Sequence, residues 1–191
     1  MLSPTASASV APTPDPRPLR LYDSWWTVAA AALLATLALT AGLWSSLHVR
    51  ADPALHTVAL FVHLASLVLG FGAVLCADYW GMLWLTRRCS LDEVLGAVSR
   101  LHTPIWAGLG GLVASGLLLH PNLGSPLTLT KLALVLVLTL NGLQAGFLGH
   151  RLAATPAPIG RGMLIWAGAT ALISQVCWWG AVVIGFLNSN R

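Results

Sequence analysis

The segment HLASLVLGFGAVLCAD, residues 63–78, begins with a histidine and ends with an aspartate, and every residue between them is apolar or small. An ionisable group inside a membrane is costly unless it faces a partner, a cavity or a metal, so such a group indicates a functional site. The helix face that begins at His63 continues through the small residues Ser66, Gly70, Ala73 and Ala77. This strip predicts a shallow groove beneath the imidazole.

The groove is compatible with two interpretations. A porphyrin plane would fit it, and neutral imidazole is an ordinary axial ligand of haem iron. Small residues also let two membrane helices approach closely, in which case His63 would hydrogen-bond a neighbour. Asp78, at the other end of the segment, is interpreted as an anchor at the inner boundary of the membrane. Its expected partners are Arg87, Arg88 or His102.

Two later apolar runs contain further candidate residues. In HTPIWAGLGGLVASGLLLH, Ala107, Gly111 and Ser115 are spaced four residues apart, so another helix or a flat cofactor can approach the backbone there. In TLTKLALVLVLTLNGLQ, Lys131 stands at the outer end, where a lysine can extend its ammonium group to the interface. Asn141 shares a face with the glutamine three residues later, and we expect both side chains to point into the bundle.

The composition requires these segments to cross a membrane. Only 8% of the 191 residues are charged and the mean hydropathy is +0.77, whereas a soluble domain carries roughly 25% charged residues. Several uncharged stretches exceed the roughly 18 residues that mark a membrane span. The predicted fold class is therefore all-α, an integral membrane bundle of five transmembrane helices. The spans are predicted at about residues 26–47, 55–85, 103–120, 128–149 and 163–187.

Residues 1–24 are rich in Pro, Ser, Thr and Ala, which predicts a disordered tail before one transmembrane domain over residues 25–191. Basic residues concentrate in the cytoplasmic loops of membrane proteins. With five spans, most of the 10 basic residues fall on the side of the N-terminus. They are Arg17, Arg20, Arg87, Arg88, Arg100, Arg151 and Arg161, against Arg50, Lys131 and Arg191 on the other side. We therefore predict a protein of the inner (plasma) membrane with a cytoplasmic N-terminus and an outer C-terminus.

This orientation sorts the histidines by depth. The outer group is His48, His56 and His120, and the inner group is His102 and His150. His63 lies two turns inside His56, roughly 10 Å deeper at 1.5 Å per residue, so it is the histidine placed within the hydrocarbon. The outer group could instead form a copper or zinc site, because imidazole suits both metals.

The order of these features is similar to that of a known family. The segment HLASLVLGFGA precedes a basic loop, and RLHTP then leads into a glycine-rich span and KLALVLVLTLNG. This order resembles the small haem-b membrane proteins typified by the bacterial protoporphyrinogen oxidase of the histidine-and-lysine type, and is similar to the copper-resistance D domain family. The resemblance covers about residues 55–187 and implies a four-helix core with an extra N-terminal helix. It also implies that His63 ligates haem b and that Lys131 is functionally required.

The sequence departs from the oxidase pattern at one pair of residues. Asn141-Gly142 stands where the oxidase often has His-Gly, and the first span is an addition. The resemblance therefore implies the fold and the haem more directly than the oxidase activity.

The leading hypothesis is a haem-b-binding membrane redox protein, for electron transfer or for oxidoreduction of a porphyrin or quinol. His63 would be the iron ligand and Lys131 the catalytic residue. His120, from a neighbouring helix, is the nearest candidate for a second ligand; without it the iron would be five-coordinate and open to substrate, which favours enzymatic chemistry over electron transfer alone. The other cofactor-binding candidates are Ser66, Gly70, Ala73, Gly111 and Asn141. Haem would bind noncovalently, because the sequence has no C-x-x-C-H motif.

The expected partners are the lipid bilayer, a quinone, a porphyrin or a redox protein, and a second copy of the chain. The net charge of +4 comes from a shortage of acids, so it indicates lipid head groups and not nucleic acid. The alternative functions are a copper or other metal-handling membrane protein, and a cofactor-free subunit of a membrane complex.

Overall fold

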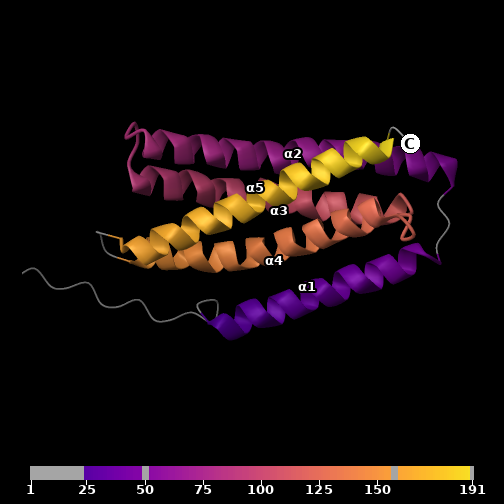
Figure 1. Ribbon diagram of the computed structural model, residues 1–191, viewed down its shortest axis with the longest axis horizontal. Coiled ribbons are helices and arrows are strands. Elements are labelled where there is room, and N and C mark those ends of the chain that lie inside the picture. The colour runs from indigo at the N-terminus through magenta and orange to yellow at the C-terminus, as the bar shows by residue number, and fades with distance from the viewer. Residues whose placement is uncertain (1–23, 49–51, 156–158, 190–191) are drawn as a thin grey trace, which may run out of the picture.

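The computed structural model describes residues 24–48, 52–155 and 159–189, which form a bundle of long helices (Figure 1). These are α1 Trp25–Ser46, α2 Pro53–Leu85, α3 Leu91–Leu118, α4 Pro126–Ala154 and α5 Arg161–Ser189. All 5 are long and apolar enough to cross a membrane, so the predicted all-α fold with five transmembrane helices is confirmed. Of the predicted tail, only Ser24 lies within these ranges, and its hydroxyl caps α1 by accepting a hydrogen bond from the Trp26 N–H at 3.3 Å.

The charged segment before the third span is helical from Leu91 onward, which corrects the predicted boundary. α3 begins at Leu91 and not near residue 103. Ser90 and Glu93 form a capping box in which Ser90 Oγ accepts from the Glu93 N–H at 3.3 Å and the Glu93 carboxylate accepts from the Ser90 N–H at 2.7 Å. Apolar length identifies only the part of a helix that lies in lipid, whereas the cap determines where this helix begins.

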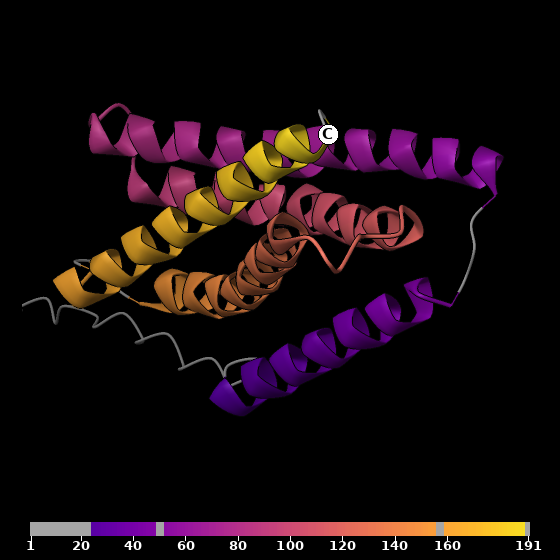
Figure 2. The same cartoon turned by 45° about the vertical axis from the view of Figure 1, so that its right-hand side comes forward.

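The helices pack as two antiparallel hairpins with α1 outside them. α2 pairs with α3, and α4 pairs with α5. α5 runs obliquely, from beside α4 at one end to beside α2 at the other (Figures 1 and 2). α1 lies along the outside of the bundle, against α4 and α3 (Figure 2). The arrangement is therefore a four-helix core with an extra N-terminal helix.

The centre of the core is the side chain of Trp178 on α5, which is only 2% exposed. The ring of Phe71 on α2 stacks on it with 5.7 Å between centroids and meets the next indole, Trp179, edge-on at 5.0 Å. The buried residues packed around this centre come from the four core helices and are Val74, Leu109, Leu138 and Cys177. These contacts join α2 to α5, and so join the two hairpins.

Large apolar side chains are exposed on all of the described helices. On α2 they include Phe61, at 73% exposure, and Val68, at 75%. An extensive apolar exterior of this kind is compatible with a lipid bilayer and not with water.

Candidate functional site

The small-residue strip below His63 is covered by α3. Gly70 and Gly108 face each other so closely that a Cβ atom added at Gly70 would lie 3.1 Å from the Gly108 Cα. Ser66 Oγ occupies the space that a Cβ atom would need at Gly111. Both helices present small residues, so their backbones meet and the open groove predicted from α2 alone is absent from this face. Ser66, Gly70 and Gly111 therefore form a helix contact, and Ala73 is buried beside it.

The same contact fixes the orientation of His63, whose ring lies against α3 as predicted for a group that faces the bundle. His63 Nδ1 is 3.0 Å from Ser115 Oγ. The Ser115 hydroxyl also contacts the Gly111 carbonyl, to which it can donate its single hydrogen. With that hydrogen used there, its oxygen accepts from Nδ1–H, which assigns the proton of a neutral His63 ring to Nδ1 and the lone pair to Nε2.

Lys131 lies at the same end of the bundle as His63. Its Nζ is 3.6 Å from the position of a Cβ atom added at Gly185 on α5. The ammonium group is also within electrostatic range of the His63 ring. The two residues that the family resemblance singled out are therefore brought to one end of the core, one on α2 and one on α4.

Asn141 belongs to a separate polar network between α4 and α5. Its side-chain amide donates to the Thr170 carbonyl at 2.9 Å. Gln144 donates to the Thr170 hydroxyl at 2.9 Å and accepts from the Trp166 indole N–H at 2.7 Å. The prediction that Asn141 and Gln144 share an inward face is confirmed. Thr170 and Trp166 were missed, although their four-residue spacing matches one helix face.

Asp78 pairs with α5 and not with the residues expected from the sequence. Its carboxylate accepts a hydrogen bond from Gln175 Nε2. The predicted partners were Arg87, Arg88 and His102, because the predicted topology places them at the same inner boundary of the membrane as Asp78. The rotation of α2 instead turns Asp78 toward α5, so this carboxylate joins the two hairpins.

The outer histidines do not assemble into a metal site. His120 lies just after α3 and has a left-handed backbone, with φ of 50°. The ring of His48 packs on Trp44, with centroids 4.5 Å apart. Across residues 24–48, 52–155 and 159–189 there is no group of three or more His, Cys, Asp or Glu side chains that could hold a metal ion. His48, His56 and His120 therefore do not form the predicted copper or zinc site.

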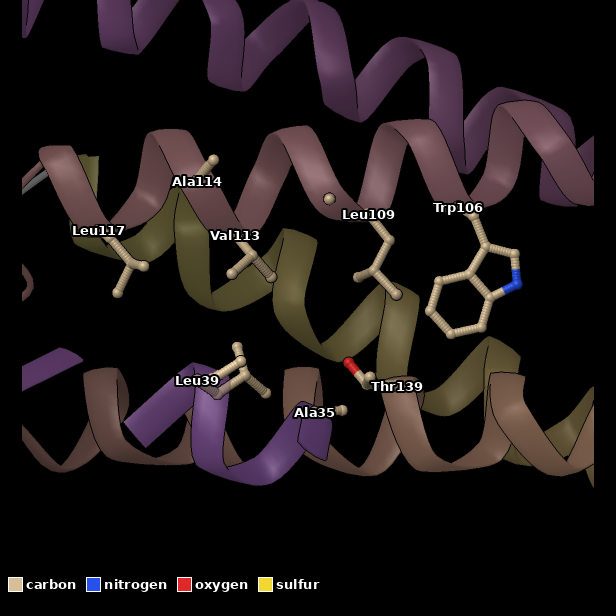
Figure 3. Close-up of a pocket in the computed structure, with 10 residues that line it drawn as sticks. Ala35, Leu39, Trp106, Leu109, Val113, Ala114, Leu117 and Thr139 are labelled. Atoms are coloured by element: carbon tan, nitrogen blue, oxygen red, sulfur yellow. The ribbon is translucent and has the colours of Figure 1, made fainter. Parts of the chain in front are cut away.

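Two partly open cavities lie between α1 and the α3–α4 pair, with Ala38 of the first and His150 of the second exposed. Sequence reasoning missed both. One has a volume of about 320 Å³ and walls that are almost entirely apolar (Figure 3). Its lining residues are Ala35, Ala38, Leu39, Trp106, Leu109, Gly110, Val113, Ala114, Leu117 and Thr139. The second, also about 320 Å³, contains two histidines. It is lined by Thr27, Val28, Ala31, His102, Trp106, Gly142, Leu143, Gly146, Phe147 and His150.

Comparison with known proteins adds no relative to this picture. No protein-family model matches the chain, and neither does any curated protein or solved structure.

Proposed function

We propose that the protein is a membrane-embedded haem-b protein with a redox function, in which His63 ligates the iron through Nε2. The observation that carries this proposal is the hydrogen bond from His63 Nδ1 to Ser115 Oγ at 3.0 Å. Histidines that bind metals usually donate their other ring N–H to an oxygen, which fixes the ring and makes the ligating nitrogen more basic. His63 has this arrangement within a membrane helix.

The residues near His63 fit the donor chemistry of an iron porphyrin. An imidazole lone pair supplies the axial bond. Lys131 supplies a cation at the same end of the core, which would neutralise a propionate carboxylate. The strip Ser66, Gly70 and Ala73 is not available as a floor for the ring because α3 covers it. Its role is to hold α2 against α3, so that Ser115 meets His63.

Bound haem would supply reversible one-electron chemistry, and the protein's part is to hold and shield it. The half-buried ring of His63 on α2 is held against α3, so it would lose little rotamer freedom when it binds the iron. Lys131 is half-buried against α5, where its charge is poorly screened by water. The lysine is therefore proposed to anchor the cofactor and not merely to extend to the membrane surface.

The test is the visible absorption spectrum of full-length protein purified in detergent after expression with added haem. Wild-type protein is expected to show the Soret band of noncovalent haem b, and His63→Ala is expected to lose it. His102→Ala is the matched control, because His102 is also a half-buried histidine but lies on a different helix, α3, and not on α2 with His63. Wild-type protein that is monodisperse yet colourless would overturn the proposal and favour a cofactor-free subunit.

A further inference from the structure

The two cavities beside α1 adjoin each other along its length. Both are lined by Trp106, and their α1 walls follow successive turns through Thr27, Ala31, Ala35 and Ala38. From the first to the last of these residues α1 rises roughly 16 Å at 1.5 Å per residue. The two spaces therefore follow one another along α1, with Trp106 as a wall common to both, and we treat them as two halves of one site between α1 and the α3–α4 pair.

α1 is held at both ends of this site. At one end the Trp25 ring packs on Phe147, with centroids 4.7 Å apart, and stacks on Trp166 at 5.8 Å. At the other end the Leu117 side chain fills the space beside Gly42. The alanines that face α3 and α4 between these contacts are too short to fill the gap, so the space persists as cavity volume.

The site is polar at one end only. His102 Nε2 lies 3.5 Å from the position of a Cβ atom added at Gly146, so this ring rests on the α4 backbone. His150, one turn further along α4, is within electrostatic range of His102. The six-membered ring of Trp106 faces Leu109, and its indole nitrogen lies on the side away from that residue (Figure 3). The cavity beyond Trp106 is almost wholly apolar.

We propose that this site binds a prenylated quinone, with the ring at His102 and His150 and the isoprenoid tail along the alanines of α1. Imidazole N–H groups donate to the ring carbonyl oxygens. Trp106 and His102 pack directly on α4 at Gly142 and Gly146, so their rings form the wall beside which a planar ring can lie. A phospholipid head group is less suited to this wall, because none of the described lining residues is Lys or Arg and the neighbouring Arg151 guanidinium is engaged over the Phe147 ring, 4.6 Å from its centroid. α1 is therefore one wall of a binding site, and the site does not depend on haem at His63.

The test is a titration of full-length protein in detergent with decylubiquinone, followed by quenching of tryptophan fluorescence. His102→Ala is expected to weaken binding about tenfold, the cost of one buried hydrogen bond. Ala35→Phe fills the apolar cavity and is expected to weaken the binding of decylubiquinone by at least about tenfold. The same substitution is expected to leave the affinity for the corresponding quinone without an alkyl tail unchanged. Ala30→Phe is the matched control, since Ala30 lies on the exposed side of the same helix.

The same titration with oleate separates a quinone site from a general lipid groove. Competition by oleate at equal affinity, with no effect of His102→Ala, would overturn the proposal, as would the lack of saturable quinone binding to monodisperse wild-type protein. His63→Ala is expected to bind decylubiquinone with unchanged affinity. Quinone binding at His102 and haem binding at His63 are therefore measured independently, and either one can be absent without the other.

Discussion

Replacing Ser115 with alanine removes the hydroxyl group that orients His63. Ser115 is 2% exposed, and its oxygen is the acceptor for His63 Nδ1–H at 3.0 Å. Without it, the ring is free to rotate or to move its proton to Nε2, the nitrogen proposed to bind iron. The Gly111 carbonyl keeps its place in the α3 backbone, so the helix itself is expected to persist.

The expected loss of haem affinity follows from what is known of hydrogen-bond partners of metal-bound histidines. Loss of a hydrogen bond to a metal-bound histidine costs roughly 10- to 100-fold in metal affinity, which corresponds to about 1.4–2.8 kcal/mol. Leaving a buried N–H without a partner costs a similar amount, about 1–3 kcal/mol. We therefore expect Ser115→Ala to bind haem 10- to 100-fold more weakly than wild type, and His63→Ala to bind it more weakly still.

The assay is spectroscopic titration of haem into apo-protein in detergent, supported by the rate of haem transfer to an apo-globin. Ser66→Ala is the control, because it removes a hydroxyl from the same α2–α3 contact without touching His63. Ser115→Ala in the His63→Ala background should have no further effect on haem. Wild-type affinity in Ser115→Ala, or an equal loss in Ser66→Ala, would refute the reasoning that Ser115 sets the state of the ring.

Three further predictions concern packing and topology. Gly108→Ala should lower the thermal unfolding temperature in detergent because its Cβ atom would overlap Gly70, at a cost of about 1–3 kcal/mol. Gly110 has open space around it, so Gly110→Ala should not lower this temperature. Equal unfolding temperatures for the two variants would contradict the close contact. Asn141→Leu should destabilise the α4–α5 pair by roughly 0.6–1.7 kcal/mol, the average and the maximum for hydrogen bonds between membrane helices, and an unfolding temperature equal to wild type would contradict this. Reporter fusions after residue 191 should be active only outside the cytoplasm, and cytoplasmic activity would reverse the predicted orientation.

The sequence predicts the helices of this fold well, because a membrane span is defined by a local property. An apolar run long enough to cross lipid must satisfy its own backbone, so it must be a helix wherever it packs. The missed start of α3 has a local cause too, since the capping box at Ser90 and Glu93 marks the boundary within a charged segment. Apolar length alone cannot detect a helix that continues beyond the hydrocarbon.

The partners of the candidate residues were much harder to predict. His63 and Ser115 are 52 residues apart, and their contact depends on the rotation of two helices about their axes. The pairing of Asp78 with Gln175 depends on the same kind of rotation, and it was predicted wrongly. His102 and His150 were placed at one side of the membrane, but the cavity beside them arises only once α1 packs against α3 and α4. Rotation and packing are properties of the bundle, not of any one segment.

The stacking of Trp25 on Phe147 and Trp166 has a consequence for synthesis. α1 leaves the ribosome before α4, and Phe147 follows Trp25 by 122 residues, roughly 6–24 s at 5–20 residues per second. During that interval the face of α1 that will line the cavities is exposed to acyl chains. Alanine and threonine tolerate this wait, because lipid tails are as apolar as the packed interior. A charge introduced on that face would be penalised during insertion, before any ligand could pair with it, so membrane insertion restricts the residues allowed on this face of α1 before the finished site does.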